Sequence, residues 1–261
     1  MMLFDTHCHL TLIKSNKDDI KAIIKNAVKN RITSIIDISA GLSDFFTRRI
    51  ILKEVFCKYS CALYLSTGIP PYFSDKRVQR DIDEVKNQAE SEKKVIGIGE
   101  IGLDYYHNYG DKKQQISLFI EQIDLANQLN LPVIIHTRDA DSDLVDTLKH
   151  HKPLKDGIVH CFSSGVRIAR ALLDLGMYLS FAGNITYKKS DQLRDAARFV
   201  PRDRYVIETD SPYLPPEGHR GKPNEPANII HTAGYIAELR GISLEFLAEQ
   251  TTRNAKTLLS L

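Results

Sequence analysis

Short apolar runs alternate with longer amphipathic segments along most of the chain. The apolar runs are rich in β-branched residues and too short for buried helices, so they predict strands. Strands are predicted for the opening run that ends at His9 and for the segments Ile32–Ile38, Cys61–Thr67, Val95–Ile98, Leu131–Ile135, Gly157–Val159, Met177–Phe181 and Tyr205–Glu208.

Apolar residues recur at helical spacing in the segments between these strands, which predicts amphipathic helices. The predicted helices cover Lys17–Asn30, Ser43–Lys58, Arg77–Lys93, Asp111–Leu129, Asp139–His150, Arg167–Leu175, Asp191–Phe199, Asn228–Leu239 and Ser243–Leu259. The proline-containing stretch Gly68–Tyr72 is expected to be a loop. Strands that alternate with helices in this way form parallel sheets through right-handed crossovers.

The order of these elements favours one domain over the whole chain. No linker, internal repeat or low-complexity tract interrupts the 261 residues, and a closed barrel of eight strand–helix units takes about 250 residues. We therefore predict that residues 1–261 form a single α/β domain, a (β/α)₈ TIM barrel. An open, doubly wound parallel sheet is the alternative architecture.

Charge and cysteine content narrow the classes of function. A formal net charge of +2 provides no strong positive field for duplex DNA, so any nucleic acid would have to be held by local contacts. Cys57 and Cys61 lack CxxC spacing, and strand alternation is expected to turn Cys8 and Cys161 away from the histidines beside them. Neither a signal-peptide pattern nor a membrane-spanning apolar run is evident, so we expect a cytoplasmic protein with no membrane contact. The oligomeric state is left open.

Six residues that can bind metal ions stand at the ends of predicted strands. His7 and His9 are separated by one residue, so alternation along a strand points both imidazoles to one face. The others are Glu100 after the fourth strand, His136 after the fifth, His160 after the sixth and Asp210 after the eighth. The carboxyl ends of all barrel strands meet at one rim, where the active sites of this fold lie. This convergence predicts a metal site at that rim.

Four imidazoles and two carboxylates exceed the needs of one tetrahedral ion, so two divalent ions are predicted, with one carboxylate shared. Two neighbouring ions can deprotonate a water molecule and stabilise the oxyanion that its attack forms. Asp210 is placed to contact the first ion and to accept the proton from that water. The residues therefore predict metal-assisted hydrolysis.

Several segments resemble the signatures of the TatD-type metal-dependent deoxyribonucleases, a family of the amidohydrolase superfamily. They are Asp5–Leu10, Gly99–Tyr105, Leu131–Val133, His136–Ala140, His160–Ser163, Glu208–Pro212 and Arg220–Pro226, and they span the chain from end to end. The resemblance implies a TIM barrel and a divalent-metal nuclease that cleaves phosphodiester bonds of DNA, often from an end. Single-stranded or end-processed DNA would be its substrate.

The resemblance also implies roles for individual residues. The implied ligands are His7 and His9 on the first ion, His136 and His160 on the second, and Glu100 between the two ions. Asp210 would be both a ligand and the general base. Glu208, two residues earlier, is assigned a catalytic or metal-linked role, with a strand-end carboxylate paired to an arginine as the alternative. The identity of the ions stays open between Mg²⁺, Mn²⁺ and Zn²⁺.

Four residues are candidate substrate contacts. Arg138, two residues after His136, is placed to meet a phosphate oxygen or to form an ion pair with a nearby aspartate. Arg220 and Asn224 lie in the loop after the last strand, which fits a local phosphate grip. Asn184 follows the seventh strand and is expected either to donate to substrate or to cap a turn.

The chain departs from the family pattern after the third strand. The family has Gly-x-His-Pro-His there, whereas this sequence reads Gly68-Ile69-Pro70-Pro71-Tyr72. Neither missing histidine belongs to the predicted ligand set. The departure therefore bears on substrate choice and efficiency rather than on metal binding.

Two other functions fit the same scaffold. Two ions and a carboxylate serve a carbonyl as readily as a phosphorus centre, so an ester or amide hydrolase, such as an aminoacyl-tRNA deacylase, is the first alternative. Loss of Arg138 and Arg220 should impair a nuclease more than a small-amide hydrolase. A non-catalytic protein that binds partners through the barrel surface is the second alternative, and the complete ligand set argues against it.

Overall fold

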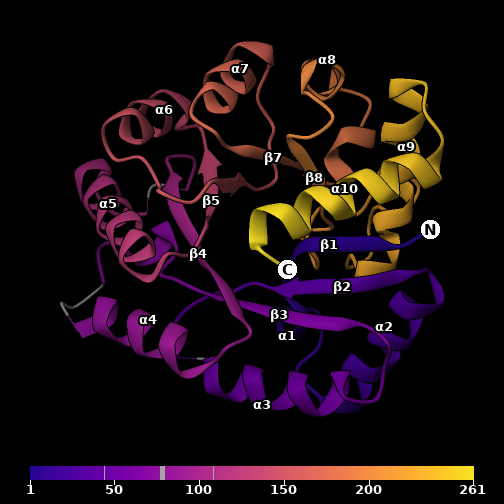
Figure 1. Cartoon of the computed structure of the whole chain (residues 1–261), viewed down its shortest axis with the longest axis horizontal. Helices are drawn as coiled ribbons and strands as arrows, with labels where there is room; N and C mark the ends of the chain where they lie inside the picture. The colour runs from indigo at the N-terminus through magenta and orange to yellow at the C-terminus, as the bar shows by residue number, and fades with distance from the viewer. Residues whose placement is uncertain (44, 77–79, 108) are drawn as a thin grey trace.

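Eight parallel strands form the centre of the protein and helices surround them (Figure 1). The computed structural model describes residues 1–43, 45–76, 80–107 and 109–261. Neighbouring strands pair in sequence order from β1 to β8. The strands are β1 Leu3–Cys8, β2 Ile32–Asp37, β3 Ala62–Thr67, β4 Val95–Asp104, β5 Val133–Arg138, β6 Gly157–Val159, β7 Tyr178–Phe181 and β8 Tyr205–Ile207.

A seam between the first strand and the segment after the last one closes this sheet. Asp210 donates its backbone N–H to the His7 carbonyl at 2.9 Å, and His9 donates to the Ser211 carbonyl at 2.7 Å. Cys8 and Ser211 also form a parallel bridge. The closure confirms the predicted (β/α)₈ TIM barrel and excludes the open doubly wound sheet, whose two edge strands do not meet.

Each helix that the apolar spacing predicts is present with ends shifted by at most a few residues, and α1 is an additional short helix. They are α1 Leu10–Ile13, α2 Lys17–Lys29, α3 Phe45–Phe56, α4 Arg80–Ser91, α5 Lys112–Leu129, α6 Asp141–His150, α7 Val166–Asp174, α8 Asp191–Phe199, α9 Ile229–Arg240 and α10 Leu244–Leu259, with 3₁₀ turns η1 Pro71–Phe73, η2 Gly183–Thr186 and η3 Pro226–Asn228. The predictions for Ser43–Lys58 and Arg77–Lys93 correspond to α3 and α4; residues 44 and 77–79 lie outside the described residues. None of the helices in the described ranges is both long enough and apolar enough to cross a membrane.

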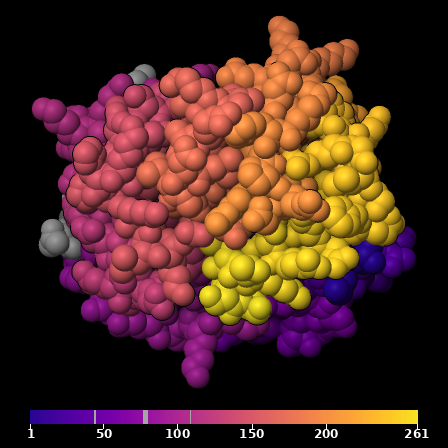
Figure 2. Space-filling model, turned by 45° about the horizontal axis from the view of Figure 1, so that its top comes forward, coloured from indigo at the N-terminus to yellow at the C-terminus, as the bar shows by residue number. Residues whose placement is uncertain are grey.

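The amino end of the barrel is packed with apolar side chains and covered by the last helix. The interior cluster is formed by Phe4, Ile36, Ile38, Ile96, Ile134, Ile158, Tyr178 and Val206, with Ala255, Leu258 and Leu259 from α10. In Figure 1, α10 crosses the middle of the barrel. The Thr252 hydroxyl donates to the Met2 carbonyl at 3.0 Å, and Figure 2 shows the yellow C-terminal segment against the indigo N-terminal one. Within the barrel, this packing leaves the opposite, carboxyl end open for a site.

Strand β4 is longer than the sequence pattern predicts. It continues past Ile98 to Asp104, with a register irregularity between Gly99 and Ile101 where it pairs with β5. A side chain at Gly99 would bring its Cβ within 2.6 Å of the Ile134 carbonyl oxygen, so only glycine allows this close approach. As a result Glu100 lies within the strand rather than after it.

A buried ion pair connects the carboxyl ends of β1, β2 and β3. Arg48 on α3 and Asp37 at the end of β2 are 1% and 0% exposed. The Arg48 Nη1 donates to the Asp37 Oδ2 at 2.9 Å, and its Nη2 donates to the Ser66 carbonyl at 2.9 Å. The other carboxylate oxygen of Asp37 accepts from the Leu10 N–H at 2.8 Å. The pair thereby fixes the turn that follows His9.

Arg48→Met should lower the free energy of unfolding by about 3–5 kcal/mol, because it leaves the Asp37 carboxylate buried without its cation. Urea titration followed by circular dichroism measures this change. Arg49→Met is the control, since Arg49 is partly exposed and lies 3.7 Å from Glu92; it should cost no more than about 1 kcal/mol. If both variants lost the same free energy of unfolding, the buried pair of Arg48 and Asp37 would not have this stabilising role.

Candidate metal centre

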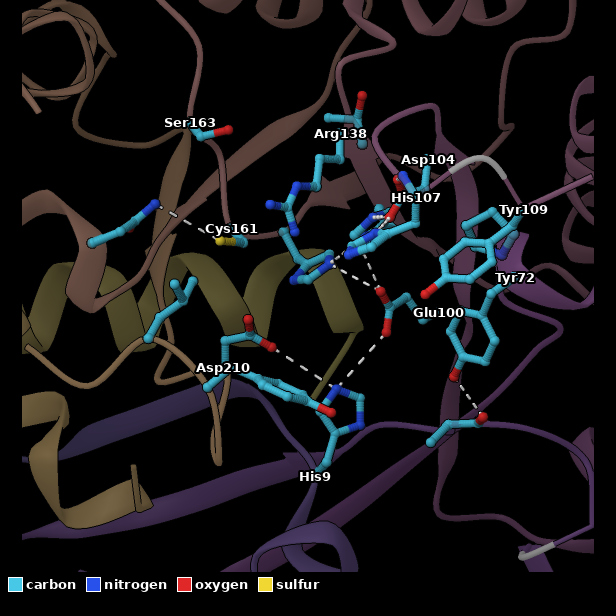
Figure 3. Close-up of a pocket in the computed structure, with 18 of the residues that line it drawn as sticks. His9, Tyr72, Glu100, Asp104, His107, Tyr109, Arg138, Cys161, Ser163 and Asp210 are labelled. Carbon is cyan, nitrogen blue, oxygen red and sulfur yellow. Dashed lines mark hydrogen bonds and ion pairs between the residues drawn. The ribbon is translucent and has the colours of Figure 1, made fainter. Parts of the chain in front are cut away.

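The predicted ligands converge on one pocket at the carboxyl end of the barrel. The pocket has a volume of about 650 Å³, and its lining includes His9, Glu100, His136, His160 and Asp210. His7 lies beneath them, fully buried. In Figure 3 the Glu100 carboxylate points into the pocket, and dashed lines join His9 to Glu100 and to Asp210. Its volume falls in the range of about 300–1,000 Å³ that is usual for small-molecule sites.

One group of ligand atoms comes from β1, β4 and the segment after β8. The Nε2 atoms of His7 and His9 are 3.3 Å apart. The Glu100 Oε2 lies 3.9 Å from the first and 3.8 Å from the second. The Asp210 Oδ1 lies 3.7 Å and 3.9 Å from the same two nitrogens.

These distances fit a shared cation better than direct hydrogen bonds. Separations of 3.7–3.9 Å between nitrogen and oxygen are too long for hydrogen bonds. Ligands bound at about 2.0–2.2 Å around a tetrahedral ion lie roughly 3.3–3.6 Å from one another. This donor set can therefore hold a divalent ion with only small shifts of its side chains.

A second group forms around the other oxygen of Glu100. The Glu100 Oε1 lies 2.9 Å from the His136 Nδ1 and 3.2 Å from the His160 Nε2, and these two nitrogens are 3.1 Å apart. All three residues have ligand atoms within 4.8 Å of one another, as do His7, His9 and Glu100. Glu100 thus presents one oxygen to each pair of histidines.

In three of the four histidines, the ring nitrogen that faces away from the other ligand atoms has a hydrogen-bond partner that orients the imidazole. The His9 Nδ1 donates to the Ile38 carbonyl at 3.1 Å, which leaves the lone pair on its Nε2. The His160 Nδ1 lies 3.3 Å from the Glu208 Oε1, and the His136 Nε2 lies 3.2 Å from the Asp104 Oδ2. Metal-binding histidines in general carry a carboxylate or carbonyl on the nitrogen that faces away from the ion.

Burial and charge separate the protonation states of the two histidine pairs. Burial lowers the pKa of His7 and of His9, which keeps both imidazoles neutral and ready to bind a cation. Burial also acts to lower the pKa of His160, but the charge of Glu100 and the hydrogen bonds to Glu100 and Glu208 outweigh it and raise that pKa well above its usual range. A cation that binds His160 must therefore displace a proton.

Glu208 lies behind His160 rather than in the pocket lining. Its carboxylate is fully buried, and its Oε1 accepts the Cys161 N–H at 2.7 Å in addition to facing His160. Among the described residues its partners are thus an imidazole and a backbone amide, and no arginine pairs with it. This placement suits a residue that orients His160.

The four candidate substrate residues fall into two groups. Arg138 and Asn184 line the pocket; the guanidinium of Arg138 lies over the Tyr106 ring at 3.8 Å. Arg220 and Asn224 are not part of the lining. Arg220 lies 3.8 Å from Glu217 on the loop after β8. Asn224 is buried, and its side-chain amide donates hydrogen bonds to two backbone carbonyls.

Two residues near the ligands were misjudged or missed in the sequence. Cys161 was expected to turn away from the site, but it lines the pocket (Figure 3). Strand β6 ends at Val159, and Cys161 has a left-handed backbone with a φ of 45°, so strand alternation does not reach it. The sequence pattern ends β4 at Ile98, so it does not indicate Asp104 as a site residue. The i, i+2 and i+4 spacing of Glu100, Gly102 and Asp104 could have indicated that both carboxylates face the same side.

Comparison with known proteins identifies the family. The model of the TatD related DNase family matches residues 4–260. The chain belongs to this family. The match confirms the resemblance drawn from the sequence motifs.

Individual relatives agree with this assignment. YcfH of Escherichia coli K12, named an uncharacterized metal-dependent hydrolase, is 38% identical over 97% of this chain and 94% of its own. The crystal structure of YjjV, a TatD homologue from Escherichia coli K12, superimposes with a TM-score of 0.90 at 30% identity over 99% of this chain and 98% of YjjV. An amidohydrolase structure from Saccharomyces cerevisiae has a TM-score of 0.86 at 16% identity over 99% of each chain, which shows the shared fold alone. The chain is thus grouped with the metal-dependent hydrolases of the TatD family.

Glu208→Gln should weaken the binding of divalent ions by about 10- to 100-fold, because it removes the charge that orients His160. Competition with a chelating dye measures this affinity. Glu217→Gln is the matched control, since Glu217 stands on the exposed loop after β8. If both variants bind ions as the wild type does, Glu208 has no part in holding the metal ligands.

Proposed function

We propose that this protein hydrolyses phosphodiester bonds of DNA, at accessible single-stranded or processed ends, with two divalent ions held at the carboxyl end of the barrel. His7 and His9 would hold the first ion, His136 and His160 the second, and Glu100 both. The observation that carries the proposal is the position of Glu100, with its Oε2 toward the first histidine pair and its Oε1 toward the second. A carboxylate placed in this way is suited to bridge two cations.

Asp210 is the proposed general base. Its Oδ1 faces the first histidine pair, and burial raises the pKa of its carboxyl to about 8, although His160 opposes that rise. Cations nearby lower such a pKa, so the carboxylate would be ionised at neutral pH and able to accept a proton. Asp210 would take the proton of the attacking water while the oxygen of that water bonds to phosphorus and the sugar oxygen leaves. Divalent ions, when bound, acidify water and neutralise the charge that develops on the phosphate.

Arg138 is the proposed phosphate contact. Among the described residues that line the pocket it is the one arginine or lysine. Its guanidinium is held over the Tyr106 ring, which limits the entropy lost when it binds a phosphate oxygen. The planar guanidinium matches the geometry of a phosphate.

The ligand assignment predicts the metal content of variants. Protein loaded with excess Zn²⁺ and then desalted should contain about two ions per chain, as the ligand count requires. His160→Ala should lose the second ion and retain the first, because His7, His9, Glu100 and Asp210 would still hold the first ion. Mass spectrometry of the metal content measures both values.

His107→Ala is the matched control for this experiment. His107 also lines the pocket, but its Nδ1 lies 2.8 Å from the Asp104 Oδ2 and its ring stacks on Tyr109. This variant should keep both ions. Loss of one ion from His107→Ala, or retention of two in His160→Ala, would refute the assignment.

The activity itself is tested with Asp210→Asn, which keeps an oxygen ligand but removes the base. Wild-type protein should shorten an end-labelled single-stranded oligonucleotide in the presence of Mg²⁺, Mn²⁺ or Zn²⁺. The variant should be slower by about 10²- to 10⁴-fold. Gel electrophoresis of the labelled products gives the rate and the end from which cleavage begins.

The result also separates the nuclease from its alternative. Intact DNA after incubation with protein shown to contain metal would reject the proposal. The ester or amide hydrolase would then be tested on aminoacylated RNA ends with the same variant.

A further inference from the structure

Tyr213 stands at the mouth of the pocket, next to the proposed reacting groups. It lines the pocket and its side chain is 53% exposed. Its ring forms a T-shaped pair with the His9 ring, with ring centroids 6.2 Å apart and an interplanar angle of 75°. Its backbone N–H donates to the Asp210 carbonyl at 2.8 Å. An exposed aromatic ring thus lies beside His9, on the turn that also carries Asp210.

The loop that carries Tyr213 is held from below by Asn224. The Asn224 side-chain amide donates to the Thr209 and Tyr213 carbonyls, each at 2.9 Å. Its backbone N–H donates to the Pro212 carbonyl at 2.9 Å. Asn224 is only 1% exposed, so these hydrogen bonds are shielded from water. Asn224 therefore fixes the place of Tyr213 and does not reach a substrate itself.

Other apolar and aromatic groups surround the same mouth. Leu12 lines the pocket together with Tyr213 and is half-exposed. Tyr72 and Tyr109 lie on the other side of Glu100 from Asp210 (Figure 3), with ring centroids 5.7 Å apart. The Tyr72 hydroxyl donates to the Ala40 carbonyl at 2.6 Å, which anchors that wall. A flat apolar group that enters the pocket therefore meets aromatic surface.

We propose that Tyr213 is the platform on which a nucleobase of the substrate stacks, and that Asn224 is the positioning residue that holds this platform. The inference rests on the proposed function and adds a specificity-determining residue to it. Stacking on an aromatic ring tolerates every base, because each base has a π-face. The subsite therefore recognises that a base is present, not which base it is.

The observations favour a base over other parts of a nucleic acid. The sugar and the phosphate are polar and offer no flat face to a half-exposed tyrosine ring, whereas Arg138 supplies a charge for the phosphate in the same pocket. A base on Tyr213 would place its own nucleotide beside His9 and Asp210. The adjoining phosphodiester would then lie close to the ligand groups.

The test compares oligonucleotides that differ by one base. Short dye-labelled single strands carry either thymine or an abasic tetrahydrofuran unit at the terminal nucleotide, prepared separately for each end. Binding is measured by fluorescence anisotropy in the Asp210→Asn background, in which the ligand stays intact. For one of the two ends, the base should improve binding by about 5- to 150-fold.

Two variants of Tyr213 assign that preference to the ring, and a variant of Asn224 tests the positioning role. Tyr213→Leu should bring the ratio between the base-bearing and abasic ligands close to one, whereas Tyr213→Phe should keep the ratio because it retains the ring. Asn224→Ala should reduce the ratio in part. Equal binding of both ligands by the Asp210→Asn protein, or an unchanged ratio in Tyr213→Leu, would overturn the proposal.

Cleavage of the same oligonucleotides is measured separately, with protein that retains Asp210. A base preference in binding without any cleavage would reject the nuclease and leave the platform supported. Cleavage with no base preference at either end would support the nuclease and reject the platform. A rise in KM without a fall in kcat for Tyr213→Leu would further show that the ring acts in binding and not in the chemical step.

Discussion

The hydrogen bonds that join β1 to the segment after β8 are the contacts on which the site depends. They lie between residues about 200 positions apart in the sequence, and Thr209 strengthens them by donating its hydroxyl to the Asp5 carboxylate at 2.6 Å. Without this seam the sheet would be open, and Asp210 would not face the histidines of the first strand. The same contacts thus complete the fold and assemble the first group of ligand atoms.

The carboxylates around the site are distributed unequally between the two histidine pairs. Glu100 lies between four imidazoles, while Glu208 and Asp104 support the second pair from outside the ligand group. In the part of the chain that the structure describes, the outer nitrogens of the first pair face no such carboxylate; the His9 Nδ1 donates to a backbone carbonyl instead. Protons compete with cations more strongly at the second pair than at the first. The two halves of the centre therefore differ in how acid would affect them.

The barrel and the convergence of the six proposed ligands could be predicted from the sequence, because both follow from where polar residues stand relative to buried strands. The environment of the ligands could not. The length of β4 depends on the close approach of Gly99 to β5, and the orientation of Cys161 depends on a left-handed backbone. Asn224 was read as a phosphate contact because of its loop, but its hydrogen bonds run into the protein. Such features arise from tertiary contacts that local spacing does not encode.

The packed amino end of the barrel gives the pocket a floor. Phe4, Ile96 and Val206 fill the interior beneath the ligands, and α10 covers them from outside. A polymer cannot be threaded through a cavity that is closed at one end, so a strand would enter and leave by the same mouth. Under the proposed function, a DNA strand would therefore reach the site through this mouth alone.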